Sequence, residues 1–205
     1  MSAKRTRAKA ASSIGGALQY ALVLTIASLG GLVSSGALLH AELDHLANPG
    51  EVAMCDLNSL VGCGTSLLSP QAHLLFGLPN AMVGLVVFAM ATTVGLLLLS
   101  GIALPRWMWW VLSLGSLGGI GFVAWFAYQS IAVFHTLCPY CMIVWLMTIP
   151  IAIFTLARAC ATGQVPGRSL GIHVWTFRWL YAFGAVMAIA LVVVIGMRHE
   201  IAALL

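Results

Sequence analysis

Five long stretches of apolar residues constrain the fold of this chain more than any other feature of its sequence. A helix needs about 20 mostly apolar residues to cross the hydrocarbon core of a bilayer, which is roughly 30 Å thick. The stretches reach or approach that length, and they cover residues 17–39, 81–104, 107–134, 140–157 and 174–197. The sequence therefore predicts five transmembrane helices.

The composition excludes a water-soluble enzyme. Charged residues make up 7% of the chain and apolar residues 61%, whereas roughly 25% of the residues of a soluble domain are charged. The stretches lack the alternating pattern of a membrane β-barrel, and helices satisfy their own backbone hydrogen bonds in lipid. We expect an all-α integral membrane protein with a four-helix transmembrane bundle and a fifth transmembrane helix, in a single domain over residues 1–205.

Glycines and tryptophans in the stretches predict details of packing. Glycine in membrane helices allows close helix contact, and we expect such contacts at Gly30, Gly31, Gly115, Gly118, Gly119 and Gly121. Tryptophan favours the membrane–water interface, and we expect Trp107, Trp109 and Trp110 to lie there.

The charged residues predict the direction in which the chain crosses the membrane. A cytoplasmic N-terminus places eight of the nine Lys and Arg residues on the cytoplasmic side and leaves only Arg198 outside, in agreement with the positive-inside rule. Topology therefore accounts for the net charge of +4 without nucleic-acid binding. The acidic residues then all lie on the outer side: Glu42, Asp44, Glu51, Asp56 and Glu200.

Residues 40–78 form the one sizeable segment expected outside the cytoplasm. Two turn signals occur in it, Asn48-Pro49-Gly50 and Ser69-Pro70. Residues 70–78 are apolar but too few to cross, so we expect them along the interface or packed over the bundle. The histidines of the segment lack metal-ligand spacing and are expected to be solvated or interfacial: His40, His45 and His73.

Four of the five cysteines lie on the outer side, where disulfides form and persist, whereas Cys160 faces the cytoplasm. Cys138-Pro139-Tyr140-Cys141 is a Cys-x-x-Cys motif at the start of a helix. Exposed amides and the helix dipole stabilise a thiolate there, and the thiolate is the nucleophile of disulfide exchange. Because a disulfide within one helical turn constrains little of the unfolded chain, the motif predicts redox chemistry.

The outer pair, Cys55 and Cys63, has several interpretations. A structural disulfide is the usual fate of extracytoplasmic cysteines, and the four sulfurs could bind zinc, although the 55/63 spacing is poor for that. Two dithiol pairs on one membrane face also suggest an electron relay through a mixed disulfide. No haem, flavin or iron–sulfur motif is evident, so a lipid-soluble quinone is the expected electron acceptor. A small transporter or channel subunit with a structural disulfide loop is the alternative.

The chain resembles the vitamin K epoxide reductase (VKOR) family, in the bacterial form that couples disulfide formation to quinone reduction. The resemblance covers residues 55–145, and the first four stretches are similar to the four-helix catalytic bundle of the family. In DsbB-like quinone reductases the Cys-x-x-Cys precedes the loop pair, whereas here it follows. The matching residues are Cys55-Asp56, Cys63, Ser69, Phe76-Gly77-Leu78-Pro79-Asn80, Gly84 and Leu137-Cys138-Pro139-Tyr140-Cys141.

The resemblance implies a role for each outer cysteine. Cys55 is implied to exchange with a thiol partner, and Cys63 to attack Cys138. Cys141 is implied to lie nearest the quinone, which would be of the menaquinone, ubiquinone or phylloquinone type. Some bacterial relatives continue into a thioredoxin-like domain, whereas this chain stops at Leu205. The expected partner is therefore a separate DsbA-like thioredoxin-fold protein, and the expected location is the plasma membrane with the redox cysteines on the extracytoplasmic side.

The resemblance also implies two quinone-binding residues besides Cys141. Asn80 matches the asparagine that hydrogen-bonds a quinone oxygen, and Ser69 matches the serine that helps hold the loop and the site. On the residues alone, Asn80 is an ordinary helix-start residue and Ser69 an ordinary turn residue. Trp145 stands where vertebrate members carry tyrosine, so recognition of vitamin K epoxide and of anticoagulants is not implied.

Overall fold

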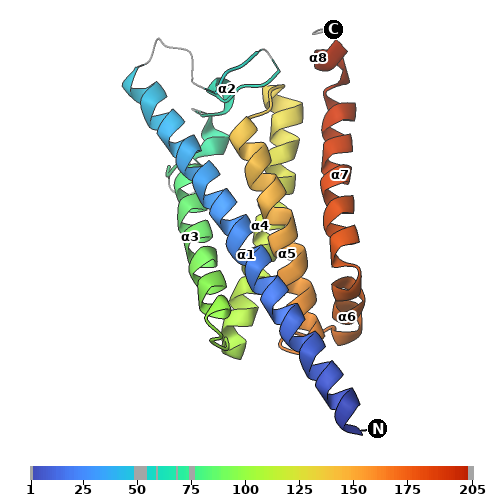
Figure 1. Cartoon of the computed structure of the whole chain (residues 1–205). Helices are drawn as coiled ribbons and strands as arrows, with labels where there is room; N and C mark the ends of the chain where they lie inside the picture. Colours follow the sequence, from blue (N-terminus) through green and yellow to red (C-terminus); the bar gives the residue numbers. More distant parts are fainter. Residues whose placement is uncertain (1, 49–54, 59, 68, 74–76, 203–205) are drawn as a thin grey trace.

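The structure, a computed structural model, describes residues 2–48, 55–58, 60–67, 69–73 and 77–202. Five helices within these ranges are long and apolar enough to cross a membrane, which confirms the all-α membrane fold. The elements are α1 (Ser2–Ala47), α2 (Gly64–Leu67), η1 (Pro70–Ala72), α3 (Asn80–Leu99), α4 (Arg106–Gln129), the π-helical turn η2 (Ser130–Phe134), α5 (Pro139–Ala161), α6 (Arg168–Thr176), α7 (Arg178–Gly196) and α8 (Arg198–Ala202) (Figure 1).

Several helix ends differ from those expected. α1 continues through residues 40–47, which were expected in the outer loop, because residues 37–48 contain neither glycine nor proline and the first stop signal is Pro49. α3 ends at Leu99 rather than near residue 104, since Gly101 adopts a positive φ of 81° and turns the chain. The fifth stretch is divided at Phe177, which is the residue between α6 and α7.

α5 is the central helix of the bundle. It contacts α1, α4, α6 and α7, whereas α3 packs mainly against α1 (Figure 1). α7 is the most peripheral of the five long helices, because only 11% of its most apolar stretch is buried inside the protein. Its remaining apolar surface suits contact with lipid, as expected for a helix outside a four-helix bundle.

The interface of α1 and α3 depends on small residues. A Cβ atom added to Gly95 would lie 2.4 Å from Oγ1 and 3.0 Å from the backbone nitrogen of Thr25, so the helices approach closely only because Gly95 has no side chain. Thr92 donates a hydrogen bond of 2.9 Å to Ser28 across the same interface. The close contacts expected at Gly30 and Gly31 are also present, against Met147 and Phe88.

The packing of α4 differs from the sequence-based expectation. No described atom comes within 4 Å of a Cβ built on Gly115, Gly118 or Gly121, so these glycines make no helix contact within the chain, and the expectation was wrong for them. Trp109 is buried, with its ring centroid 5.5 Å from that of Tyr20, whereas Trp107 and Trp110 are exposed. The membrane-interface position expected for the three tryptophans stays a prediction.

The two ends of the bundle carry different structures. α2, α8 and the start of α5 lie at one end, and α6 and the N-terminus lie at the other (Figure 1). The turn expected at Pro49 and Gly50, the acidic Glu51 and the motif residue Phe76 lie outside the described residues, as does part of the segment 70–78. The expected interfacial position of that segment therefore stays a prediction.

Candidate active site

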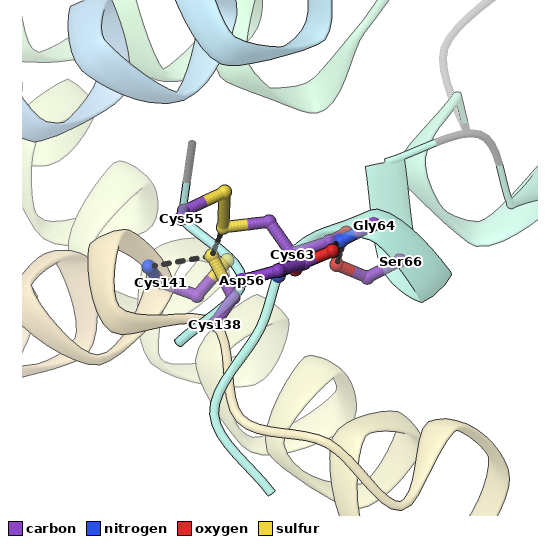
Figure 2. Close-up of a disulfide and its surroundings, with 7 residues drawn as sticks. All are labelled: Cys55, Asp56, Cys63, Gly64, Ser66, Cys138 and Cys141. Carbon is purple, nitrogen blue, oxygen red and sulfur yellow. Dashed lines mark hydrogen bonds between the residues drawn. A yellow bond between two sulfur atoms is a disulfide. The ribbon is translucent and has the colours of Figure 1, made fainter. Parts of the chain in front are cut away.

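The four cysteines that were expected on the outer side lie together at the end of the bundle that carries α2 (Figure 1). Cys55 and Cys63 form a disulfide, and Cys138 and Cys141 are free thiols. The Cys138 sulfur lies 3.3 Å from the Cys63 sulfur and accepts the backbone N–H of Cys141 at 3.4 Å (Figure 2). All four are buried. The two pairs expected from the sequence therefore meet in one cluster, with Cys63 and Cys138 at the junction.

Backbone hydrogen bonds bring the outer segment to the Cys-x-x-Cys motif. The amide of Leu137 donates to the carbonyl of Leu60 at 2.8 Å, and the amide of Gly62 donates to the carbonyl of Leu137 at 3.1 Å. These bonds make an isolated parallel β-bridge between Val61 and Leu137. Cys138 follows Leu137 directly and Cys63 lies two residues after Val61, so the bridge holds their sulfurs side by side.

Asp56 holds the backbone around Cys63. Its Oδ1 accepts the amides of Cys63 at 2.6 Å and Gly64 at 2.9 Å, and bonds from amides to a carboxylate are among the stronger hydrogen bonds in proteins. A Cβ on Gly64 would lie 2.6 Å from Oδ2 of Asp56. The lack of a side chain at Gly64 thus lets the carboxylate reach both amides.

The surroundings of Cys138 favour its thiolate. Cys138 is the N-cap of α5, with φ −77° and ψ 120°, and Pro139 occupies the first helical turn, where its missing N–H costs nothing. A hydrogen bond with the Cys141 thiol lowers the pKa of Cys138, and the amides of Cys141 and Tyr140 add to this, against burial and the charge of Asp56. The surroundings of Cys138 therefore favour its thiolate form, which is the form that takes part in disulfide exchange.

His135 occupies the turn before the motif. It has a positive φ of 53° directly after η2, and its Nδ1 lies 2.9 Å from a carboxylate oxygen of Glu200 in α8. The backbone amide of Glu200 itself and the contact with His135 lower the pKa of this carboxyl. His135 thus links α8 to the loop that carries the motif, which fits an interfacial residue better than a direct partner of the thiolates.

A small cavity of about 30 Å³ lies beside Cys141 and has room for about one water molecule. Asn80 lies in its wall, and its side-chain amide donates to the carbonyl of Gln71 at 2.7 Å. Asn80 is the first residue of α3, as expected from the sequence alone, and Pro79 is the N-cap. The wall consists of Leu38, Glu42, Ser66, Leu67, Ala72, Asn80, Ala81, Phe126 and Cys141.

Ser69 stabilises the outer segment and is not part of the cavity wall. It is the N-cap of η1, where its hydroxyl accepts the amide of Ala72 at 3.2 Å and donates to the carbonyl of Ser66 at 2.7 Å. This agrees with the turn role and with a role in holding the loop.

Sequence reasoning missed Glu42, His73 and Phe126. Glu42 is 2% exposed and lies in the cavity wall. His73 was expected to be solvated or interfacial, but its Nε2 lies 2.9 Å from Oε1 of Glu42. The spacing of Leu38 and Glu42 would have placed both on one helix face, had α1 been extended beyond residue 39.

Comparison with protein families gives one match. The model of the Vitamin K epoxide reductase family matches residues 22–156, more than half of the chain. The matched region includes both cysteine pairs and every residue of the cavity wall. It leaves out α6, α7 and α8. No curated protein matches the chain.

Proposed function

Because the chain belongs to the vitamin K epoxide reductase family, we propose that it reoxidises a separate DsbA-like, thioredoxin-fold protein and passes the electrons through its two cysteine pairs to a membrane quinone. Members of this family are membrane thiol–disulfide oxidoreductases that use a quinone as electron carrier. The proposal adds the partner, the relay and the residues. In the cell, this reaction would drive disulfide formation outside the cytoplasm.

The observation that carries the relay is the 3.3 Å approach of the Cys138 sulfur to Cys63, which is disulfide-bonded to Cys55. The reduced partner gives two electrons and two protons to the Cys55–Cys63 disulfide and leaves with its own disulfide. The Cys63 thiolate then attacks Cys138 of an oxidised motif and releases the Cys141 thiolate. Attack of Cys55 on Cys63 releases Cys138 and restores the loop disulfide. The pairing in the structure corresponds to this last state.

The donor set of the cavity suits a quinone head group. Asn80 can donate an amide N–H to a carbonyl oxygen, Phe126 offers a ring face, and Cys141 brings a thiol. A quinone ring is several times larger than a water molecule, so the wall has to widen when the ring enters. When bound, the quinone accepts two electrons and two protons as the Cys138–Cys141 disulfide forms.

Replacement of Cys63 tests the relay. We expect Cys63→Ala to abolish oxidation of a thioredoxin-fold partner by the purified protein, because Cys138 loses its route to the loop. Quinone reduction by a small dithiol, which reaches the motif directly, should persist. Cys160→Ala is the matched control and should behave as the wild type. If Cys63→Ala oxidises the partner at the normal rate, the Cys55–Cys63 disulfide is structural and the relay is wrong.

A further inference from the structure

The ion pair of Glu42 and His73 has no place in the relay. Glu42 belongs to α1 and His73 follows η1 in the outer segment, and Oε1 lies 2.9 Å from Nε2. Glu42 is 2% exposed, and burial of an ionisable group costs free energy unless the group is neutral or is paired with another charge. Within the described residues, Oε1 makes this ion-pair contact and no hydrogen bond.

The other ring nitrogen of His73 indicates where a proton held by the pair would lie. Nδ1 lies 3.1 Å from the carbonyl oxygen of Ser69, and a carbonyl only accepts, so Nδ1 carries a hydrogen. At Nε2 the proton either stays on the ring, which gives a charged pair, or moves to Oε1, which gives a neutral pair. Both arrangements hold one proton between Nε2 and Oε1.

The pair connects the cavity with the outer surface. Glu42 lies in the cavity wall with Asn80 and Cys141, whereas the His73 side chain is 26% exposed. Among the described residues, the ionisable groups around Glu42 are His73, Cys141 in the same wall, and His45 one turn further along α1, whose Nδ1 is buried without a described partner. A proton at His73 can thus exchange with water, while a proton at Glu42 is shielded from it.

We propose that Glu42 is the catalytic acid that delivers a proton to the bound quinone, and that His73 replaces this proton from the outer aqueous side. The inference rests on the proposed quinone reductase function. Formation of the Cys138–Cys141 disulfide breaks two S–H bonds and sends two electrons to the quinone, whose two oxygens gain two protons. The Cys141 thiol supplies one proton and Oε1 of Glu42 the other. The Cys138 thiol releases its proton to the outer water. His73 takes up one proton from that water and passes it to Glu42, so protons and charge balance.

The test compares Glu42→Gln with Asp44→Asn in the full-length protein, with a small dithiol as reductant and a short-chain quinone as acceptor. Asp44 lies on the same helix, is half-buried and bonds Asn48. We expect Glu42→Gln to slow quinone reduction by about 100-fold or more, as for loss of a general acid. It should bind the quinone with unchanged affinity, measured by quenching of tryptophan fluorescence, and should still exchange thiols at Cys55 and Cys63. Asp44→Asn should match the wild type.

Infrared difference spectroscopy provides a readout that does not depend on turnover. Addition of quinone to the wild type should change the carbonyl band of a protonated carboxyl group. This change should be absent in Glu42→Gln, present in Asp44→Asn, and altered in His73→Gln, which keeps an amide near Oε1 but cannot relay a proton. The wild-type band tests the proposal even if Glu42→Gln does not fold.

The outcomes separate this inference from the proposed function. If the wild type reduces quinone and Glu42→Gln does so equally fast, the acid is not Glu42 and the inference alone is overturned. The same holds if the wild type shows no carboxyl band that responds to quinone. If the wild type oxidises no thiol with a quinone, the proposed function itself fails and the inference fails with it.

Discussion

At the scale of single residues, the sulfur of Cys138 joins the two cysteine pairs. It accepts the amide of Cys141 at 3.4 Å, lies 3.3 Å from the Cys63 sulfur, and caps α5. The sequence predicted that a helix starts at the motif, because a helix start with proline in the first turn is a local feature. That Cys138 itself caps the helix is shown by the structure. The neighbourhood of Cys63 and Cys138 was implied only by family resemblance, since the β-bridge that aligns them joins segments far apart in the chain.

The carboxylate of Asp56 should influence the acidity of Cys138. Its charge raises the pKa of Cys138, against the larger lowering effect of the Cys141 thiol. Asp56→Asn keeps an oxygen that can accept the amides of Cys63 and Gly64, which both bond Oδ1, but it removes the charge. We therefore expect the pKa of Cys138 to fall further.

The pH dependence of thiol modification in reduced protein measures this effect. In the wild type, the midpoint for Cys138 should lie below the ordinary cysteine value of about 8.5, and Asp56→Asn should move it to lower pH. Because a depressed pKa favours the folded thiolate above the unfolded value, any stability that it adds is lost as the pH falls through the folded value. Asp44→Asn is the control. A midpoint that rises in Asp56→Asn contradicts the assignment.

Asn80 is the residue whose replacement should separate quinone chemistry from thiol exchange. It lies in the cavity wall with Cys141. Its side-chain amide donates a hydrogen bond to the carbonyl of Gln71 in η1. Asn80→Ala should slow quinone reduction by about 100-fold to 1,000-fold, by analogy with the loss of an oxyanion donor. Exchange at Cys55 and Cys63 should remain near normal. Stopped-flow measurement of both steps checks this, with Asn48→Ala as a control, and a defect in thiol exchange alone would place the quinone elsewhere.

At the scale of elements, the sequence located the five long helices but not all of their ends, and an incorrect end hid part of the site. The apolar stretches located the five long helices, because the length needed in lipid is a strong constraint. The same criterion ended the first helix near residue 39, where polar residues begin, although α1 continues to Ala47. Glu42 was therefore assigned to a loop, and its place in the cavity wall could not be inferred. Which glycines meet a neighbouring helix could not be inferred either, since this depends on how α4 is rotated.

The glycine contacts give a prediction about bundle stability. A methyl group on Gly95 would meet Oγ1 of Thr25 at 2.4 Å and its backbone, whereas one on Gly121 meets nothing within 4 Å. We expect Gly95→Ala to lower the free energy of unfolding by about 1–3 kcal/mol through overpacking, because the backbone of α1 cannot easily yield. Gly121→Ala, the matched control, should leave stability unchanged or slightly raised. Unfolding in detergent by denaturant measures both, and equal stabilities would contradict the close approach of α1 and α3.

At the scale of the whole molecule, the two ends of the bundle differ in chemistry. The end with α2 and α8 holds the four clustered cysteines (Figure 1). It also holds two acids that each contact a histidine, Glu42 and Glu200. At the end with α6, Arg178 bonds the side chain of Gln19 and stacks 4.5 Å from the ring centroid of Trp175. An arginine anchored by an aromatic ring at a helix end is typical of a membrane interface. This polarity agrees with the segregation of charges along the sequence.

The last prediction concerns which end of the bundle faces the cytoplasm. The excess of Lys and Arg at the α6 end predicts that this end faces the cytoplasm and that the cysteine cluster faces outward, where disulfides persist. Native Cys55 and Cys63 are too buried to report on this, so exposed positions are better probes. Leu57 beside the cluster is 72% exposed, and Thr162 at the end of α5 is exposed as well. A membrane-impermeant maleimide applied to intact cells should label Leu57→Cys and should label Thr162→Cys only after permeabilisation, with the wild type giving the background. Labelling of Thr162→Cys alone in intact cells would invert the topology and place the cysteine cluster in the reducing compartment, where a loop disulfide could not persist as an oxidant.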